Sequence, residues 1–138
     1  MQKRERMISI LAWFRLSRFY HESIRRSNQH LKKWDLTISQ FDVLAQVGAS
    51  EPISQQELAE KLLVTKGNVT HMLAKMEQLG WVKREREWKT KYITLTPKGK
   101  RMLEDVLPAQ EQFQADQFKN LSFDEKKQLH ELLKKLES

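Results

Sequence analysis

The chain of 138 residues contains no cysteine, only four glycines and only three prolines. Without cysteine, disulfide scaffolds, thiolate metal sites, cysteine nucleophiles and thiol redox switches are all excluded. The scarcity of glycine and proline favours helices joined by few loops. No apolar run approaches the length that a membrane-spanning helix needs. The basic N-terminus lacks the small-residue cleavage site of a secretory signal, so we expect a cytoplasmic protein that does not contact the membrane.

Signatures of catalysis and metal binding are also missing. The sequence has no glycine-rich phosphate loop, no Ser/His/Asp order and no recognisable pair of catalytic carboxylates. Its four histidines show neither His-x-x-x-His nor Glu-x-x-His spacing; they are His21, His30, His71 and His130. We therefore predict that the protein is not an enzyme, holds no metal and carries no cofactor.

Positive charge is concentrated in one part of the chain. The net charge is +7, and residues 61–101 contain eleven basic side chains against three acidic ones. The rest of the sequence is close to neutral. A basic segment on a near-neutral body indicates a polyanionic partner, most often DNA, although a basic helix face is often only a solvated surface.

Both ends of the chain are predicted to be helical. Apolar residues recur at helical spacing from Ile10 to Leu31, which predicts a helix from about Glu5 to about Lys33. Thr96 and Pro97 can start a second helix, which Pro108 should bend without ending its apolar trend, and Ser122 with Glu125 forms a capping box for a third. The apolar faces of these terminal helices can pack against each other or against another copy of the chain, and the hypothesis that follows is a homodimer through these helices.

Capping patterns divide the middle of the chain into short helices followed by a hairpin. The helix starts are marked by Thr37 with Gln40, by Ser54 with Glu57, and by Thr65, and Gly80 ends the last helix. Residues 81–84 and 92–95 are rich in β-branched and aromatic side chains, so they predict a two-stranded wing with a tip at residues 85–91. The predicted fold is mainly α with a small β-wing. One domain contains a winged helix–turn–helix at about residues 36–99, flanked by dimerisation helices at 1–35 and 100–138.

The helix that follows Thr65 is the predicted recognition helix for the major groove. Asn68 can read adenine, Lys66 can read guanine, and the methyl group of Thr70 can contact a thymine methyl. Other DNA-binding candidates on this helix are Thr65, Gly67, His71 and Lys75. Phosphate contacts are expected at Ser54, Gln55 and Gln56, where a helix start offers free amides. On the wing, the candidates for backbone or minor-groove contacts are Arg84, Arg86, Lys89 and Lys91.

With these features in this order, the chain resembles the MarR family of bacterial winged-helix regulators. The matching segments are residues 36–44 (LTISQFDVL), 56–59 (QELA), 69–73 (VTHML), 77–84 (EQLGWVKR) and 95–99 (LTPKG). The resemblance implies a homodimer that places two recognition helices in successive major grooves of a pseudo-palindrome and usually represses transcription. The family's wing usually carries Asp-x-Arg, whereas this chain has Glu87-Trp88-Lys89 on a shorter wing. Lysine lacks the planar fork of arginine, and Arg86 is a possible substitute.

The resemblance also implies an effector site, because many members release DNA when a small aromatic or phenolic ligand binds. The corresponding candidates are Trp13, Phe14, Tyr20, His21 and Trp34, and the same spacing is typical of ordinary core packing. Two alternatives to a sequence-specific regulator remain open: a winged-helix module for protein partners, and a non-specific DNA-binding protein.

Overall fold

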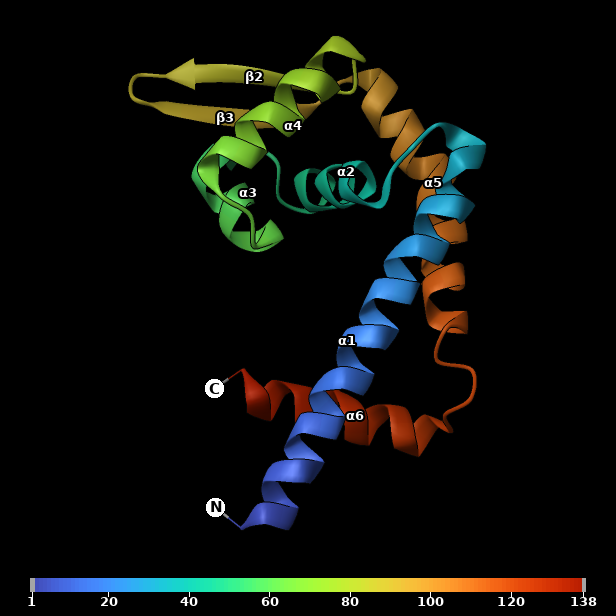
Figure 1. Cartoon of the computed structure of the whole chain (residues 1–138). Coiled ribbons are helices and arrows are strands. Elements are labelled where there is room, and N and C mark those ends of the chain that lie inside the picture. Colours follow the sequence, from blue (N-terminus) through green and yellow to red (C-terminus); the bar gives the residue numbers. More distant parts are fainter. Residues whose placement is uncertain (1, 138) are drawn as a thin grey trace.

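A computed structural model describes residues 2–137 as a mainly helical chain with a small antiparallel sheet (Figure 1). The helices are α1 (Lys3–Leu31), α2 (Ile38–Ser50), α3 (Gln55–Leu62), α4 (Lys66–Gln78), α5 (Pro97–Asp116) and α6 (Phe123–Leu136), with a 3-10 turn, η1 (Lys32–Trp34), after α1. The strands are β1 (Ile53–Ser54), β2 (Val82–Glu87) and β3 (Thr90–Leu95). The predicted fold class is confirmed.

Side-chain caps start the helices where the sequence places them. The Thr37 hydroxyl accepts a hydrogen bond from the Gln40 amide, and the Gln40 side chain accepts one from the Thr37 amide. A second reciprocal box joins Ser122 and Glu125. Thr65 caps α4, and Thr96 caps α5 with Pro97 in its first turn. Each cap satisfies an amide that would otherwise lack a partner at the start of a helix.

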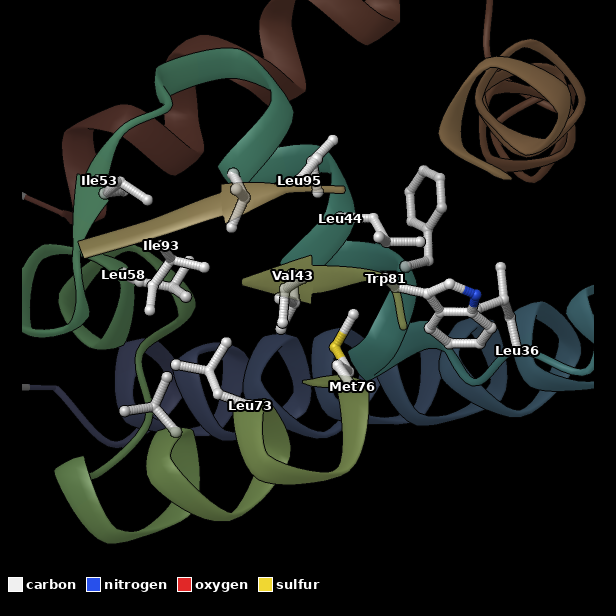
Figure 2. Packing of buried hydrophobic residues seen from close by; sticks show 14 of the residues in the cluster. Leu36, Val43, Leu44, Ile53, Leu58, Leu73, Met76, Trp81, Ile93 and Leu95 are labelled. Carbon is white, nitrogen blue, oxygen red and sulfur yellow. The ribbon is translucent and has the colours of Figure 1, made fainter. Parts of the chain in front are cut away.

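The core lies between α2, α3, α4 and the sheet (Figure 2). Leu44 of α2, Leu58 of α3, Leu73 of α4 and Ile93 of β3 are all fully buried. Burying a side chain of this size stabilises the fold by about 1.5–3 kcal/mol. Because one cluster includes residues of these four elements, together with Leu31 of α1 and Val106 of α5, α4 is fixed against the rest of the winged helix through its inner face.

The sheet has the strand order β1-β3-β2, and the β2–β3 hairpin pairs from Val82 opposite Leu95 to Glu87 opposite Thr90. The sequence missed β1, since two residues are too few to show a period. The predicted hairpin tip at residues 85–91 was wrong, because both strands run farther and leave only Trp88 and Lys89 in the turn. The outer hairpin is exposed, so it lacks the apolar alternation that marks a half-buried strand.

Two glycines fix the join between α4, the wing and α5. Gly80 has φ +80° and ends α4, in the left-handed region where glycine is favoured. A Cβ on Gly99 would lie 2.0 Å from the carbonyl oxygen of Trp81, so only glycine allows α5 to approach Trp81, just before β2, this closely. Thr96 adds a hydrogen bond from its hydroxyl to the Gly80 carbonyl.

The last turns of α1 pack against α5 through polar and aromatic side chains. Gln110 is fully buried; its Nε2 donates to Ser27 Oγ at 3.3 Å, and its Oε1 lies 2.9 Å from His30 Nδ1. The His30 ring stacks on Phe113 with centroids 4.3 Å apart. Helix α5 continues past Pro108 to Asp116.

The N-terminal half of α1 extends away from the winged helix (Figure 1). Large apolar side chains there are at least 40% exposed; they include Met7, Ile8, Ile10, Leu11, Trp13, Phe14, Leu16, Phe19 and Tyr20. An apolar surface of this extent is unusual for a monomeric protein and is typical of an interface.

Candidate nucleic-acid interface

Helix α4 has one buried face and one exposed face, as the sequence predicts. Val69, Leu73 and Met76 are fully buried against the core. The opposite face is exposed along the whole helix, at Lys66, Gly67, Asn68, Thr70, His71, Ala74, Lys75 and Gln78. This face offers positive charge and hydrogen-bonding groups, while Gly67 and Ala74 are small enough to allow close approach.

The start of α4 is held in place by its cap. The Thr65 hydroxyl accepts from the Asn68 amide at 3.1 Å, which fixes the first turn and its exposed side chains Lys66 and Asn68. The positive end of the helix dipole points the same way and favours a negatively charged partner. The cap therefore fixes the backbone positions from which these two side chains extend.

Thr70 is already engaged within the protein. Its hydroxyl donates to the Lys66 carbonyl at 2.8 Å and accepts from Gln55 Nε2 at 2.7 Å. Gln55 thereby links the start of α3 to α4. The hydroxyl hydrogen of Thr70 is committed to the protein, whereas its methyl group can still contact a base.

The predicted phosphate contacts at the start of α3 differ in accessibility. Ser54 is buried, and its hydroxyl accepts from the Glu57 amide, so it caps the helix. Gln55 is half-buried and bound to Thr70, while Gln56 is exposed. Gln56 is therefore the one of these three side chains that is most accessible to a phosphate.

A groove with a volume of about 440 Å³ joins α3, α4 and the wing. The groove is lined by Gln56 and Glu57 of α3, by Lys66 of α4, and by three cations of the wing, Arg86, Lys89 and Lys91. The structure thus brings together three groups of residues that the sequence predicts separately. Thr90 and Tyr92 also line the groove and were missed, since strand residues between lysines carry no distinctive signal of their own.

Arg84 binds within the protein and ties the wing to α4. Its Nη2 donates to Glu77 Oε1 at 2.9 Å, and only 20% of its side chain is exposed. This hydrogen bond, together with the guanidinium charge, lowers the pKa of Glu77. Nothing in the sequence identifies Glu77 as the partner, because the turn at Gly80 and the start of β2 separate the two residues. On the exposed wing surface, a hydrogen bond from Lys83 to Glu85 raises the pKa of Lys83.

The proposed effector residues do not come together within one chain. Trp13, Phe14 and Tyr20 are each at least 60% exposed, and their neighbour His21 is exposed too. Trp34 lies beyond the far end of α1, where its ring meets His30 at 5.4 Å. With a helical rise of about 1.5 Å per residue, Trp13 lies roughly 27 Å from the end of α1. One small molecule cannot touch both ends of this set in a single protomer.

Residues 2–137 contain neither a cluster of metal ligands nor a membrane-spanning helix. Within this range, no three histidine, aspartate or glutamate side chains are grouped as they would be around a metal ion. No helix between these limits is both long and apolar enough to cross a membrane.

An exposed polar helix beside a basic hairpin, both built on one core with a three-stranded sheet, defines the winged helix–turn–helix class of proteins. The sequence profile of the MarR family matches residues 36–88. An uncharacterized HTH-type transcriptional regulator of Bacillus cereus is 45% identical over 134 residues, which cover 96% of this chain and 91% of that protein. The chain therefore belongs to the MarR family of transcriptional regulators.

Solved structures agree with this assignment. The oxidized form of MarR from E. coli is 30% identical, with a TM-score of 0.77 over 89% of this chain and 91% of that one. A cysteine-to-serine mutant of MarR from E. coli, complexed with operator DNA, is 27% identical, with a TM-score of 0.80 over 99% of each chain.

Proposed function

We propose that the protein is a homodimer that binds pseudo-palindromic operators in double-stranded DNA and represses transcription. The observation that carries this proposal is the groove in which Lys66 of α4 faces the wing cations Arg86, Lys89 and Lys91. A surface that combines a helix start with cations on two elements suits a phosphate backbone next to a major groove. The operator complex of the E. coli MarR mutant supports the same use of this fold.

Base reading is assigned to the exposed face of α4. Lys66 and Asn68 project from its first turn toward guanine and adenine, and the Thr70 methyl group contacts thymine. His71 and Lys75 extend this surface along the helix, and Gly67 lets the backbone approach the DNA. Each good base contact provides about 1–3 kcal/mol of discrimination.

Contacts with the DNA backbone, which position the protein, are assigned to helix starts and to the wing. Thr65 and Gln56 lie at helix starts whose amides can bind phosphates, and Arg86, Lys89 and Lys91 extend this role along the wing. Arg84 acts through its ion pair with Glu77, by holding the wing against α4.

Dimerisation is assigned to the terminal helices. A second copy would cover the exposed apolar side chains of α1, such as Leu11 and Phe14. A two-fold dimer of this kind presents two α4 helices to half-sites about 34–36 Å apart, one turn of DNA.

A small aromatic ligand would relieve repression by binding beside the dimer helices. Trp13, Phe14, Tyr20 and His21 are exposed in one chain, so they can form the walls of a pocket only when a partner chain covers them. Trp34 lies too far along the chain to join them unless it belongs to the partner.

Salt dependence provides the test. Duplexes selected from a random pool at physiological salt should contain a palindrome, and the affinity for them should fall by about 10³-fold or more between about 50 and 200 mM salt. A flat salt dependence would favour a module for protein partners. Equal affinity for every duplex would instead indicate a non-specific DNA-binding protein.

A further inference from the structure

Trp88, at the tip of the wing, has an unusual conformation for its size. It occupies the two-residue turn between β2 and β3 with φ +57°, and 85% of it is exposed. A left-handed conformation costs an L-residue with a side chain about 1–2 kcal/mol, so such turns favour glycine or asparagine. Packing within the chain offsets little of this cost, since most of the indole surface is in contact with solvent. A residue held in an energetically unfavourable backbone conformation on an exposed turn points to a role in binding.

The surroundings of Trp88 are basic and continuous with the groove. Arg86 and Lys91 pair directly across the hairpin below the turn. The ammonium group of Lys89 lies 4.9 Å from the centre of the Trp88 ring, and Lys89 also lines the groove with Lys66. Glu87 is the acidic residue nearest the turn, and it is outnumbered by these cations. The wing also projects beyond α3 and α4 (Figure 1), so its tip can reach DNA outside the segment covered by α4.

We propose that Trp88 inserts its ring into the minor groove beside each half-site and favours a flexible pyrimidine–purine step there. This inference rests on the proposed function. The minor groove is about 6 Å wide and narrower still in stiff A-tracts, so an indole must widen it or partly unstack a base step. TA and CA steps yield at low cost, and apolar side chains act as wedges at such steps. The cation held over the ring would face the phosphates that flank it.

The direction of the sequence preference separates a wedge from a cation. A lysine or arginine in the minor groove favours the narrow, strongly negative A-tract, whereas an aromatic wedge disfavours it. Trp88 therefore predicts a flank preference opposite in sign to that of a wing that binds through charge alone.

The test uses the full chain and a selected duplex whose flanks carry either a TA step or an A-tract. Wild-type protein should bind the TA flank about tenfold more tightly, within the range expected for one apolar wedge. Trp88→Asn should lose about tenfold in affinity for the TA flank and bind both flanks equally. Asparagine tolerates the left-handed conformation, so the melting temperature should not fall. Trp88→Phe keeps a ring and should retain most of the preference.

Two further measurements make the result specific to Trp88. Tryptophan emission should be quenched on binding the TA flank in the wild type, and Trp88→Phe should lose most of that change. Leu63 is a matched control, because it is 92% exposed with φ +57° but lies between α3 and α4. Leu63→Asn should leave the flank preference unchanged.

The outcomes distinguish this inference from the proposed function. Trp88→Asn with wild-type affinity and flank preference, or a wild-type preference for A-tracts, would overturn the wedge and leave DNA recognition by α4 intact. Wild-type protein that bound every duplex weakly, with no steep salt dependence, would overturn both.

Discussion

Individual residues at this interface differ in how firmly the protein holds their backbone. Lys66 and Asn68 lie in a helical turn fixed by the Thr65 cap. Lys89, in contrast, follows a left-handed residue on an exposed hairpin turn. A backbone that is already ordered loses less conformational entropy when it binds DNA, so the residues of α4 can contribute more of their contact energy.

We expect Lys66→Ala and Asn68→Ala to weaken operator binding more than Lys89→Ala. Loss of a base contact of about 1–3 kcal/mol corresponds to roughly 5- to 150-fold in affinity. Lys89→Ala removes one positive charge that contacts the DNA backbone and leaves the Trp88 ring in place, so the loss of affinity should be smaller. Mobility-shift titrations measure the order, with Lys126→Ala on α6 as a control for the loss of one positive charge. The reverse order would contradict base reading by α4.

The role of a residue could be predicted from the sequence only where that role leaves a pattern among neighbouring residues. The exposed face of α4 follows from the helical period, because its buried positions Val69, Leu73 and Met76 define the opposite side. The hydrogen bond between Gln55 and the Thr70 hydroxyl could not be predicted from the sequence, because it depends on how α3 crosses α4. The Glu77–Arg84 pair is equally non-local, so Arg84 resembled a free wing cation in the sequence.

At the scale of elements, the position of the wing depends on contacts with α4 and α5. Gly99 allows the close approach of α5 to Trp81, and the Glu77–Arg84 ion pair holds β2 against α4. The capped helices could be predicted because a cap is a local motif. Strand β1 and the true ends of the hairpin could not, since pairing between strands depends on distant partners rather than on neighbouring residues.

The Glu77–Arg84 ion pair should make a small, pH-dependent contribution to stability. The folded-state pKa of Glu77 lies below its usual value of 4.5, so the contribution is present above that pH and is lost as the pH falls through the folded-state value. At pH 7, Glu77→Gln should lower the free energy of unfolding by about 0.2–1 kcal/mol, the range of a solvent-screened pair. At pH 3 the difference between the mutant and the wild type should be smaller than at pH 7.

Urea unfolding at both pH values measures this difference. Glu85→Gln is the control, because the Lys83–Glu85 pair is more exposed and joins two residues of the same strand. Its effect at pH 7 should be smaller than that of Glu77→Gln. An equal loss for Glu77→Gln at both pH values would show that the carboxylate charge is not the cause.

For the whole molecule, the main feature is a core that joins the winged helix to Leu31 at the end of α1 and Val106 of α5, while the N-terminal half of α1 extends beyond it (Figure 1). The helical period of residues 10–31 predicts α1 well, but a period cannot say which surface covers an apolar face. In one chain the N-terminal half of that face stays exposed. A partner chain would bury it and at the same time set the distance between two α4 helices.

A charged substitution on this apolar face should therefore abolish both assembly and tight DNA binding. Ile10 and Phe14 lie one helical turn apart on α1 and are 46% and 60% exposed. In the double variant Ile10→Asp/Phe14→Asp, the dimer would have to bury two carboxylates in each chain, so we expect a monomer by light scattering. Operator affinity should fall by at least about 100-fold, because two linked half-site contacts become independent ones. Gln29→Asp places one negative charge on an exposed polar position of α1 and should leave both properties unchanged. A double variant that stayed dimeric, or a monomeric wild type with full affinity, would show that α1 does not join the two DNA-binding units.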